Sequence, residues 1–211
     1  MKQRINGRLA VLTALWLLIV GVCSVAAQTQ RAGEVARMVD ALRALGRYSV
    51  TYTITADDAH VALTDGAMQG SIVVADDRYR ITLPDAEVFG EGDLRYEINH
   101  PRKEITLMTT EHESSNLLSN PARAFELIAS YRATLVAESA DMSEWSLTPP
   151  DDQLTTIRLV IDAKSHLPKR IRYEMDGAGV EIRINAIRPL STPLKAFDQS
   201  AYAGYEFIDF R

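Results

Sequence analysis

Cysteine is nearly absent from this sequence. The chain of 211 residues contains one cysteine, Cys23, which lies within an apolar N-terminal segment. Without that segment the chain can form no disulfide and offers no cysteine nucleophile, which excludes a disulfide-linked scaffold and thiol catalysis. The fold must therefore be stabilised by the packing of its apolar side chains.

Basic charge is scarce relative to acidic charge. Lysine and arginine number 23 against 28 aspartate and glutamate residues, so the formal net charge is −5 at pH 7. Because no basic stripe is present, the sequence argues against a nucleic-acid partner and against adsorption to anionic lipid headgroups. No apolar run of membrane-spanning length follows Gln30, so we expect the remainder of the chain to be soluble.

The N-terminal segment has the three parts of a secretory signal peptide. It begins with three positive charges, Lys2, Arg4 and Arg8. An uncharged apolar stretch follows over residues 9–22, and small residues stand at positions 25–27. This pattern predicts a signal peptide over residues 1–27 that is cleaved on export, leaving residues 28–211 as a single domain. The alternative is a retained membrane anchor, because uncharged residues continue to Gln30 and approach spanning length.

Helical periodicity occurs in two places. Residues 33–45 place their apolar side chains on one helical stripe, and Gly46 follows as a C-terminal stop. A second helix is predicted to begin at Pro121, where Ser119 and Asn120 supply a cap. Its apolar face would include Ala124, Leu127, Ile128, Tyr131 and Leu135.

Elsewhere the period is two, which predicts strands. In residues 48–54 large apolar side chains alternate with small polar ones, the pattern of a half-buried strand. The same alternation predicts strands over residues 72–74, 78–83, 94–98, 105–107, 145–147, 157–161, 171–175 and 180–184. Turn-forming residues separate these segments, among them residues 90–92 and 176–179. Short strands at this spacing predict a mainly β (α+β) protein built on an antiparallel meander.

The sequence offers little catalytic chemistry. Its four histidines have no second ligand at metal-binding spacing, so we interpret them as ordinary surface residues: His60, His100, His112 and His166. Residues 57–60 (Asp-Asp-Ala-His) fit a polar hairpin loop better than a metal site. No nucleophile elbow, zinc-protease or phosphate-loop motif occurs. We therefore predict a protein that is not an enzyme and that uses no metal and no cofactor.

The predicted sheet has more apolar surface than the two helices can readily cover. One antiparallel sheet of many strands presents a single large apolar face. Either the sheet curls on itself around a tightly packed core, or it curves incompletely and leaves an apolar hollow capped by helices. Periodicity alone leaves both arrangements open. A hollow would bind an apolar ligand.

The order of short motifs along the chain resembles that of the periplasmic lipoprotein carriers of the LolA type. The motifs follow one another over nearly all of residues 28–211. They are Gly70-Ser-Ile72-Val-Val74, Arg78-Tyr-Arg80, Glu91-Gly92 with Tyr96 and Asn99, Asn120-Pro-Ala122, Trp145-Ser-Leu147-Thr-Pro149, Phe197, and the closing Tyr205-Glu-Phe-Ile-Asp-Phe-Arg211.

This resemblance implies an incomplete antiparallel β-barrel (a half-barrel) whose hydrophobic concave face is covered by a helical lid. Such carriers accept acylated lipoproteins from an inner-membrane ABC transporter, shield the acyl chains in the periplasm, and deliver them to an outer-membrane acceptor. On this basis we expect acylated lipoproteins or lipids as cargo and a monomeric protein.

The resemblance also suggests which side chains would bind the cargo. The predicted cavity wall consists of Val50, Tyr52, Ile54, Ile72, Val74, Tyr79, Ile81, Leu94, Tyr96, Ile105 and Leu107. The predicted underside of the lid consists of Val35, Met38, Leu42, Phe125, Ile128 and Tyr131. For each residue alone, ordinary core packing explains its character equally well.

One departure from the family pattern concerns the lid. The family usually carries an Arg-Pro pair before the aromatic-Arg strand, and that arginine helps to latch the lid, whereas this chain has Ala75-Asp76 there. Arg78 and Arg80 are candidates to replace it, although both also fit the solvent face of their strand. The alternative function is a lipid- or peptide-binding regulatory module of the cell envelope with the same half-barrel fold. We expect such a sensor to carry a second domain.

Overall fold

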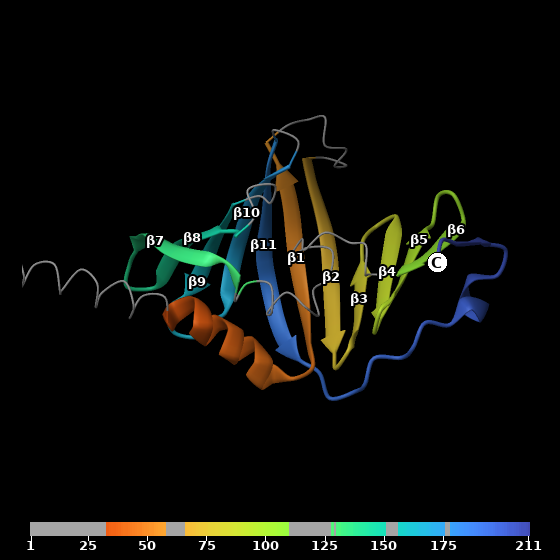
Figure 1. Cartoon of the computed structure of the whole chain (residues 1–211), viewed down its shortest axis with the longest axis horizontal. Helices are drawn as coiled ribbons and strands as arrows, with labels where there is room; N and C mark the ends of the chain where they lie inside the picture. The colour runs from red at the N-terminus through yellow and green to blue at the C-terminus, as the bar shows by residue number, and fades with distance from the viewer. Residues whose placement is uncertain (1–32, 58–65, 110–127, 129, 151–155, 176–177) are drawn as a thin grey trace, which may run out of the picture.

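The computed structural model describes residues 33–57, 66–109, 128, 130–150, 156–175 and 178–211. Within these ranges twelve strands form one sheet, in the order β12-β6-β5-β4-β3-β2-β1-β11-β10-β9-β8-β7. β12 and β7 lie at opposite ends of this order and do not pair, so the sheet is not closed. The predicted half-barrel is therefore confirmed (Figure 1). The predicted signal peptide lies outside the described residues.

The strands are short, and most occupy the segments in which the sequence alternates. Their bounds are β1 Tyr48–Ala56, β2 Ala67–Ala75, β3 Arg78–Thr82, β4 Ala86–Glu91, β5 Leu94–Asn99, β6 Glu104–Thr109, β7 Arg132–Glu138, β8 Met142–Thr148, β9 Ile157–Asp162, β10 Pro168–Met175, β11 Ala178–Pro189 and β12 Glu206–Asp209. A short 3-10 helix, η3, spans Gln199–Tyr202.

The sheet consists of two wings that meet at β1. One wing runs from β2 to β6, and the other runs from β11 back to β7. β1 joins them because it pairs antiparallel with both β2 and β11. All neighbouring strands are antiparallel except β12, which lies parallel to β6. The chain reaches β12 by a long segment that runs from the end of β11 to the far edge of the other wing (Figure 1).

A helix over residues 33–45 lies beside the wing formed by β7–β11 (Figure 1). Its apolar stripe is buried, with Met38 1% exposed and Leu42 7% exposed. These side chains belong to the same core cluster as Trp145 and Leu147 of β8. The helix ends as the sequence predicts: Gly46 has a φ of 63°, and its amide donates a hydrogen bond to the carbonyl of Arg43 at 3.0 Å.

The second predicted helix is shorter than its apolar spacing indicates. Residues 128 and 130 are helical, but Arg132–Glu138 is strand β7. Leu135 therefore lies on a strand, where it pairs with Trp145. Pairing with β8 outweighs the helical pattern, because residues 132–135 (Arg-Ala-Thr-Leu) also alternate with a period of two. The predicted helix start at Pro121 lies outside the described residues.

The prediction of a turn at residues 90–92 was partly wrong. Gly90 and Glu91 belong to β4, a strand that the sequence analysis missed, and Gly92 alone has a positive φ, of 56°. A glycine is required at position 90 because the ring of Tyr79 lies against it. A Cβ at this position would be 1.9 Å from Tyr79 Cε1.

Candidate ligand-binding cavity

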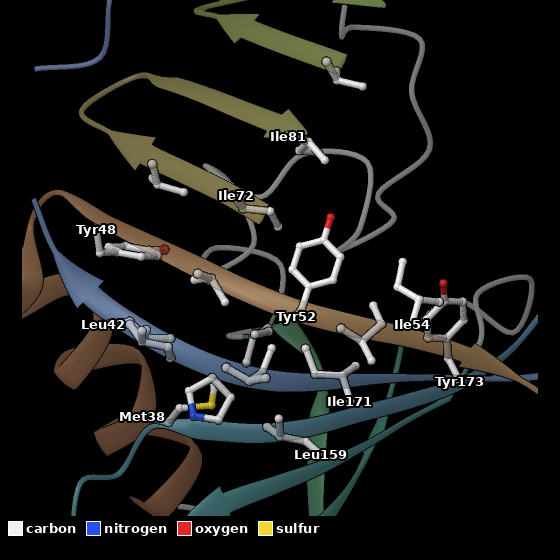
Figure 2. A pocket seen from close by; sticks show the side chains of 18 of the residues that line it. Met38, Leu42, Tyr48, Tyr52, Ile54, Ile72, Ile81, Leu159, Ile171 and Tyr173 are labelled. Atoms are coloured by element: carbon white, nitrogen blue, oxygen red, sulfur yellow. The ribbon is translucent and has the colours of Figure 1, made fainter. Parts of the chain in front are cut away.

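A cavity of about 370 Å³ lies on the concave face of the sheet. Figure 2 shows strand side chains converging on it, with Met38 and Leu42 of the helix on one side. Six predicted wall residues line it: Val50, Tyr52, Ile54, Ile72, Val74 and Ile81. Three predicted lid residues also line it: Met38, Leu42 and Ile128. That these side chains bind a ligand remains a prediction.

Strand register explains why the cavity is apolar. Directly opposed residues of antiparallel strands share a face, and Val50 is opposed by Ile72 on one side and Ile187 on the other. Ile72 is opposed in turn by Ile81, and Ile81 by Val88. One apolar row therefore crosses five neighbouring strands.

A register shift preserves this arrangement where β1 meets β11. The pairing shifts between Thr51 and Tyr52, so that Tyr52 is opposed by Ile184 rather than by Asn185. Asn185 instead lies on the opposite face of the sheet, where its Nδ2 donates a hydrogen bond to Thr53 Oγ1 at 3.0 Å. Without the shift, the residues of β11 beyond this point would face the opposite side of the sheet, and Asn185 rather than Ile184 would point into the cavity.

Eleven lining residues were missed by the sequence analysis. Most of them come from the second wing and from β4 and β5: Tyr48, Leu83, Val88, Arg95, Leu159, Pro168, Ile171, Tyr173, Ile182, Ile184 and Ile187. The strands that carry Ile171, Tyr173, Ile182 and Ile184 were predicted, but the sequence gives no sign that β11 pairs with β1. That pairing places the second wing around the cavity.

Two tyrosines of β1 contribute both apolar area and hydroxyl groups to the cavity. Tyr48 and Tyr52 are each 5% exposed. Burial raises the pKa of each hydroxyl to about 12, and the nearby Tyr173 adds to the shift at Tyr52. The Tyr52 ring lies across Gly70 of β2, its cross-strand partner. At neutral pH these hydroxyls are uncharged.

Among the residues that the structure describes, Arg95 is the one charged residue that lines the cavity. Its side chain is 12% exposed, and Nη2 lies 2.7 Å from Oε1 of Glu97 on the same strand. The positive charge is therefore compensated within the protein. The described lining therefore combines an apolar wall, several uncharged hydroxyls and one ion-paired arginine.

Four predicted wall residues lie on the opposite, convex face. Phe89 is opposed by Tyr96, whereas the cavity-lining Val88 is opposed by Glu97. Side-chain alternation then places the whole apolar row of β5 and β6 on the convex side: Leu94, Tyr96, Ile105 and Leu107. A fifth predicted residue, Tyr79, is on the concave face but is packed on Gly90 and does not line the cavity.

The convex row is apolar because the C-terminal segment covers it. The ring of Phe197 stacks on Tyr96 with centroids 4.1 Å apart, and it meets Phe89 edge-on at 5.5 Å. Tyr202 extends this aromatic cluster, with its ring 5.8 Å from that of Phe197. In this wing the outer face of the sheet is therefore a second core. Figure 1 shows the C-terminal segment running beside the β5–β6 end of the wing.

The remaining predicted lid residues have other positions. Val35 is buried in the core beneath the helix but does not line the cavity, and Tyr131 is half-buried against the same core. Phe125 lies outside the described residues. Neither arginine proposed to replace the latch reaches the helix, because Arg80 pairs with Glu87 on the convex face and Arg78 pairs with Glu91.

The histidines for which the structure gives positions are paired with carboxylates. His166 Nδ1 lies 2.6 Å from Oε1 of Glu34, at the start of the helix. His100 Nε2 lies 3.3 Å from Oε1 of Glu87. The side chains of His100 and His166 are 32% and 35% exposed, which agrees with the prediction of ordinary surface residues. His60 and His112 lie outside the described ranges. Across those ranges no three potential metal-ligating side chains are grouped to hold an ion.

Comparison with known proteins relates the chain to others by fold. No protein-family model and no curated protein matches the sequence. An uncharacterized conserved protein from Thermus thermophilus is similar in structure, with a TM-score of 0.51 at 7% identity, covering 85% of this chain and 99% of that one.

Two further structures illustrate the range of similar proteins. A LolA superfamily protein from Nitrosomonas europaea has a TM-score of 0.37 at 8% identity, with 75% of this chain and 90% of that chain covered. MucB in the Pseudomonas aeruginosa MucA/MucB complex has a TM-score of 0.44 at 14% identity, with 82% of this chain covered. This chain spans 60% of the length of that structure.

Together these observations establish the fold. The open antiparallel sheet with a helix beside an apolar concave face is the half-barrel that the motif order predicts. No helix in the described ranges is long and apolar enough to cross a lipid bilayer.

Proposed function

We propose that the cavity binds the acyl chains of a lipid-tailed cargo and that the protein carries this cargo through the periplasm. The observation that supports this proposal is the unfilled cavity of about 370 Å³, lined almost entirely by aliphatic and aromatic side chains. Its volume falls within the range of small-molecule binding sites, about 300–1,000 Å³. An acyl chain matches an apolar wall that crosses several strands.

The energetics of transfer favour such a site. Each methylene group removed from water is worth about 0.8 kcal/mol, so a chain of 13 or so methylenes is penalised by about 10 kcal/mol when exposed. A carrier has to offset much of this penalty and still release the cargo. A helix that contributes Met38 and Leu42 to the cavity suits this task, because movement of the helix would expose apolar area and weaken binding.

The wider proposal includes partners and compartment. We propose that residues 1–27 direct export and are removed, and that residues 28–211 act as a monomer. Acylated lipoproteins or lipids would be the cargo, an inner-membrane ABC transporter the donor, and an outer-membrane protein the acceptor. Because the Arg-Pro pair is replaced by Ala75-Asp76, release would not depend on the family's arginine latch.

The direct test is to express the full chain, purify the exported protein, and extract it for mass spectrometry. We expect acylated protein or lipid to copurify, and we expect the emptied protein to enhance the fluorescence of a lipophilic dye such as bis-ANS. Two variants of neighbouring residues are compared in this assay. Ile72→Glu places a carboxylate within the cavity, and its matched control Ser71→Glu places the same group on the other face of β2. An empty preparation that leaves the dye dark would contradict the proposal.

A second assay separates carrier from regulator. Loaded protein is mixed with acceptor vesicles of phosphatidylethanolamine and phosphatidylglycerol, and transfer of a radiolabelled acyl cargo is followed after sedimentation. A carrier is expected to transfer the label to the vesicles and to remain in the supernatant without it. Retention of the label would contradict the carrier role and favour the regulatory module.

A further inference from the structure

We infer that the cavity recognises the uncharged carbonyl of an ester- or amide-linked acyl chain through the hydroxyls of Tyr52 and Tyr173. This inference rests on the proposed function and narrows its ligand class. Hydrocarbons lack an acceptor for these hydroxyls, and the carboxylate of a free fatty acid would have to compete with Glu97 for Arg95.

The first argument is the position of the two hydroxyls. Tyr52 of β1 and Tyr173 of β10 both line the cavity, and Tyr52 is 5% exposed. In Figure 2 the two rings rise to the same side of the sheet, with Ile54 between them. Both hydroxyls therefore belong to side chains that line one otherwise apolar wall.

The second argument is that these hydroxyls are not used by the fold. Among the residues with described positions, neither hydroxyl has a hydrogen-bond partner, and burial alone raises the pKa of Tyr173. Phenylalanine would fill the same space without the cost of burying a polar group. Other tyrosines of this chain do have partners: the Tyr205 hydroxyl lies 3.0 Å from His100 Nδ1. A ligand acceptor would satisfy the two cavity hydroxyls.

The third argument is charge. Both hydroxyls keep their protons at neutral pH, because burial raises the pKa of Tyr52 to about 12, so they act as donors. The one charged lining residue, Arg95, is compensated by Glu97 at 2.7 Å. A carbonyl oxygen accepts hydrogen bonds and carries no charge, and in an acylated lipid it adjoins the methylene chain. This chemistry matches the cavity, whereas a carboxylate would meet only the guanidinium of Arg95, which is already paired with Glu97.

The test compares three probes of equal chain length: hexadecane, methyl palmitate and palmitate. Each displaces a lipophilic dye from emptied wild-type protein, from Tyr52→Phe and from Tyr173→Phe. We expect wild type to bind the ester more tightly than the alkane, and each variant to lower the ratio of ester to alkane affinity by about threefold to tenfold. Tyr205→Phe, outside the cavity, controls for loss of a tyrosine hydroxyl, and thermal melting confirms that every variant is folded.

Three results would overturn the inference. The first is an ester-to-alkane ratio that the two cavity variants leave unchanged. The second is that palmitate binds more tightly than its methyl ester and that the affinity for palmitate falls in Arg95→Gln. This result would assign polar recognition to the guanidinium of Arg95. The third is that no probe binds the wild-type protein. This result would contradict the proposed function as well, whereas the first two results would contradict only the inference about the carbonyl.

Discussion

Replacing Gly70 by alanine should reduce the capacity of the cavity through Tyr52. Gly70 of β2 is opposed by Tyr52 of β1. A Cβ at position 70 would lie 2.6 Å from Tyr52 Cζ and 2.7 Å from Cε2. To reach an ordinary carbon–carbon separation the ring must retreat by about 1 Å. The sheet blocks movement toward the backbone, so the ring moves into the cavity.

Two effects on stability oppose each other in this variant. Alanine restricts the unfolded chain and stabilises by about 0.4–1 kcal/mol where the backbone is compatible, as it is here because Gly70 has no positive φ. Overpacking costs about 1–3 kcal/mol. The clash involves several ring atoms, so we expect overpacking to win and to lower the melting temperature by roughly 2–8 °C.

The assay is dye binding at saturation together with thermal unfolding. Gly70→Ala should bind less dye, and Gly70→Ala combined with Tyr52→Val should recover capacity because the obstructing ring is gone. Gly90→Ala is the matched control: it clashes with Tyr79, which does not line the cavity, so stability should fall while capacity is kept. A Gly70→Ala protein with a higher melting temperature and full capacity would refute this reasoning.

Three further outcomes are expected. Ile72→Glu should abolish dye binding because it buries a carboxylate in an apolar wall, whereas Ser71→Glu should retain it; equal binding by both in the dye titration would contradict the assigned faces. Phe197→Ala should lower the free energy of unfolding in urea by about 1–3 kcal/mol, because it removes the centre of the convex aromatic cluster, while dye binding persists. The pKa of Tyr48 and of Tyr52 is about 12 in the folded protein, against 10.0 in the unfolded chain. Their contribution to the free energy of unfolding is therefore complete below pH 10 and is lost as the pH rises toward 12. Tyrosinate absorbance should therefore rise in two stages, the later one accompanied by unfolding; a single titration near pH 10 of a folded protein would contradict it.

In β2 and β3 the residues that the sequence analysis selected lie on the concave face. Ile72 and Ile81 are directly opposed, and both line the cavity. In β5 and β6 alternation also yields one apolar row, but the row points outward. Periodicity identifies the two faces of a strand and not which of them is concave.

What decides the facing of that row is a contact with a distant part of the chain. Phe197 covers Tyr96, and residues 190–211 contain no periodic pattern that would predict where they pack. The predicted C-terminal end of the second helix is wrong for a related reason, because Arg132–Glu138 forms strand β7. Leu135 satisfies both the helical and the strand pattern, and only its pairing with Trp145 selects the strand.

The place of β1 in the middle of the sheet determines when the protein can fold. β1 precedes one of its two partners, β11, by a long stretch of chain, and Val50 must find Ile187, which lies 137 positions further along (187 − 50). Such long-range pairing is slow to form. Until it does, β1 presents an unpaired hydrogen-bonding edge with apolar residues beside it, which is a template for aggregation. Pairing with β11 therefore shields this edge of β1 in the folded protein.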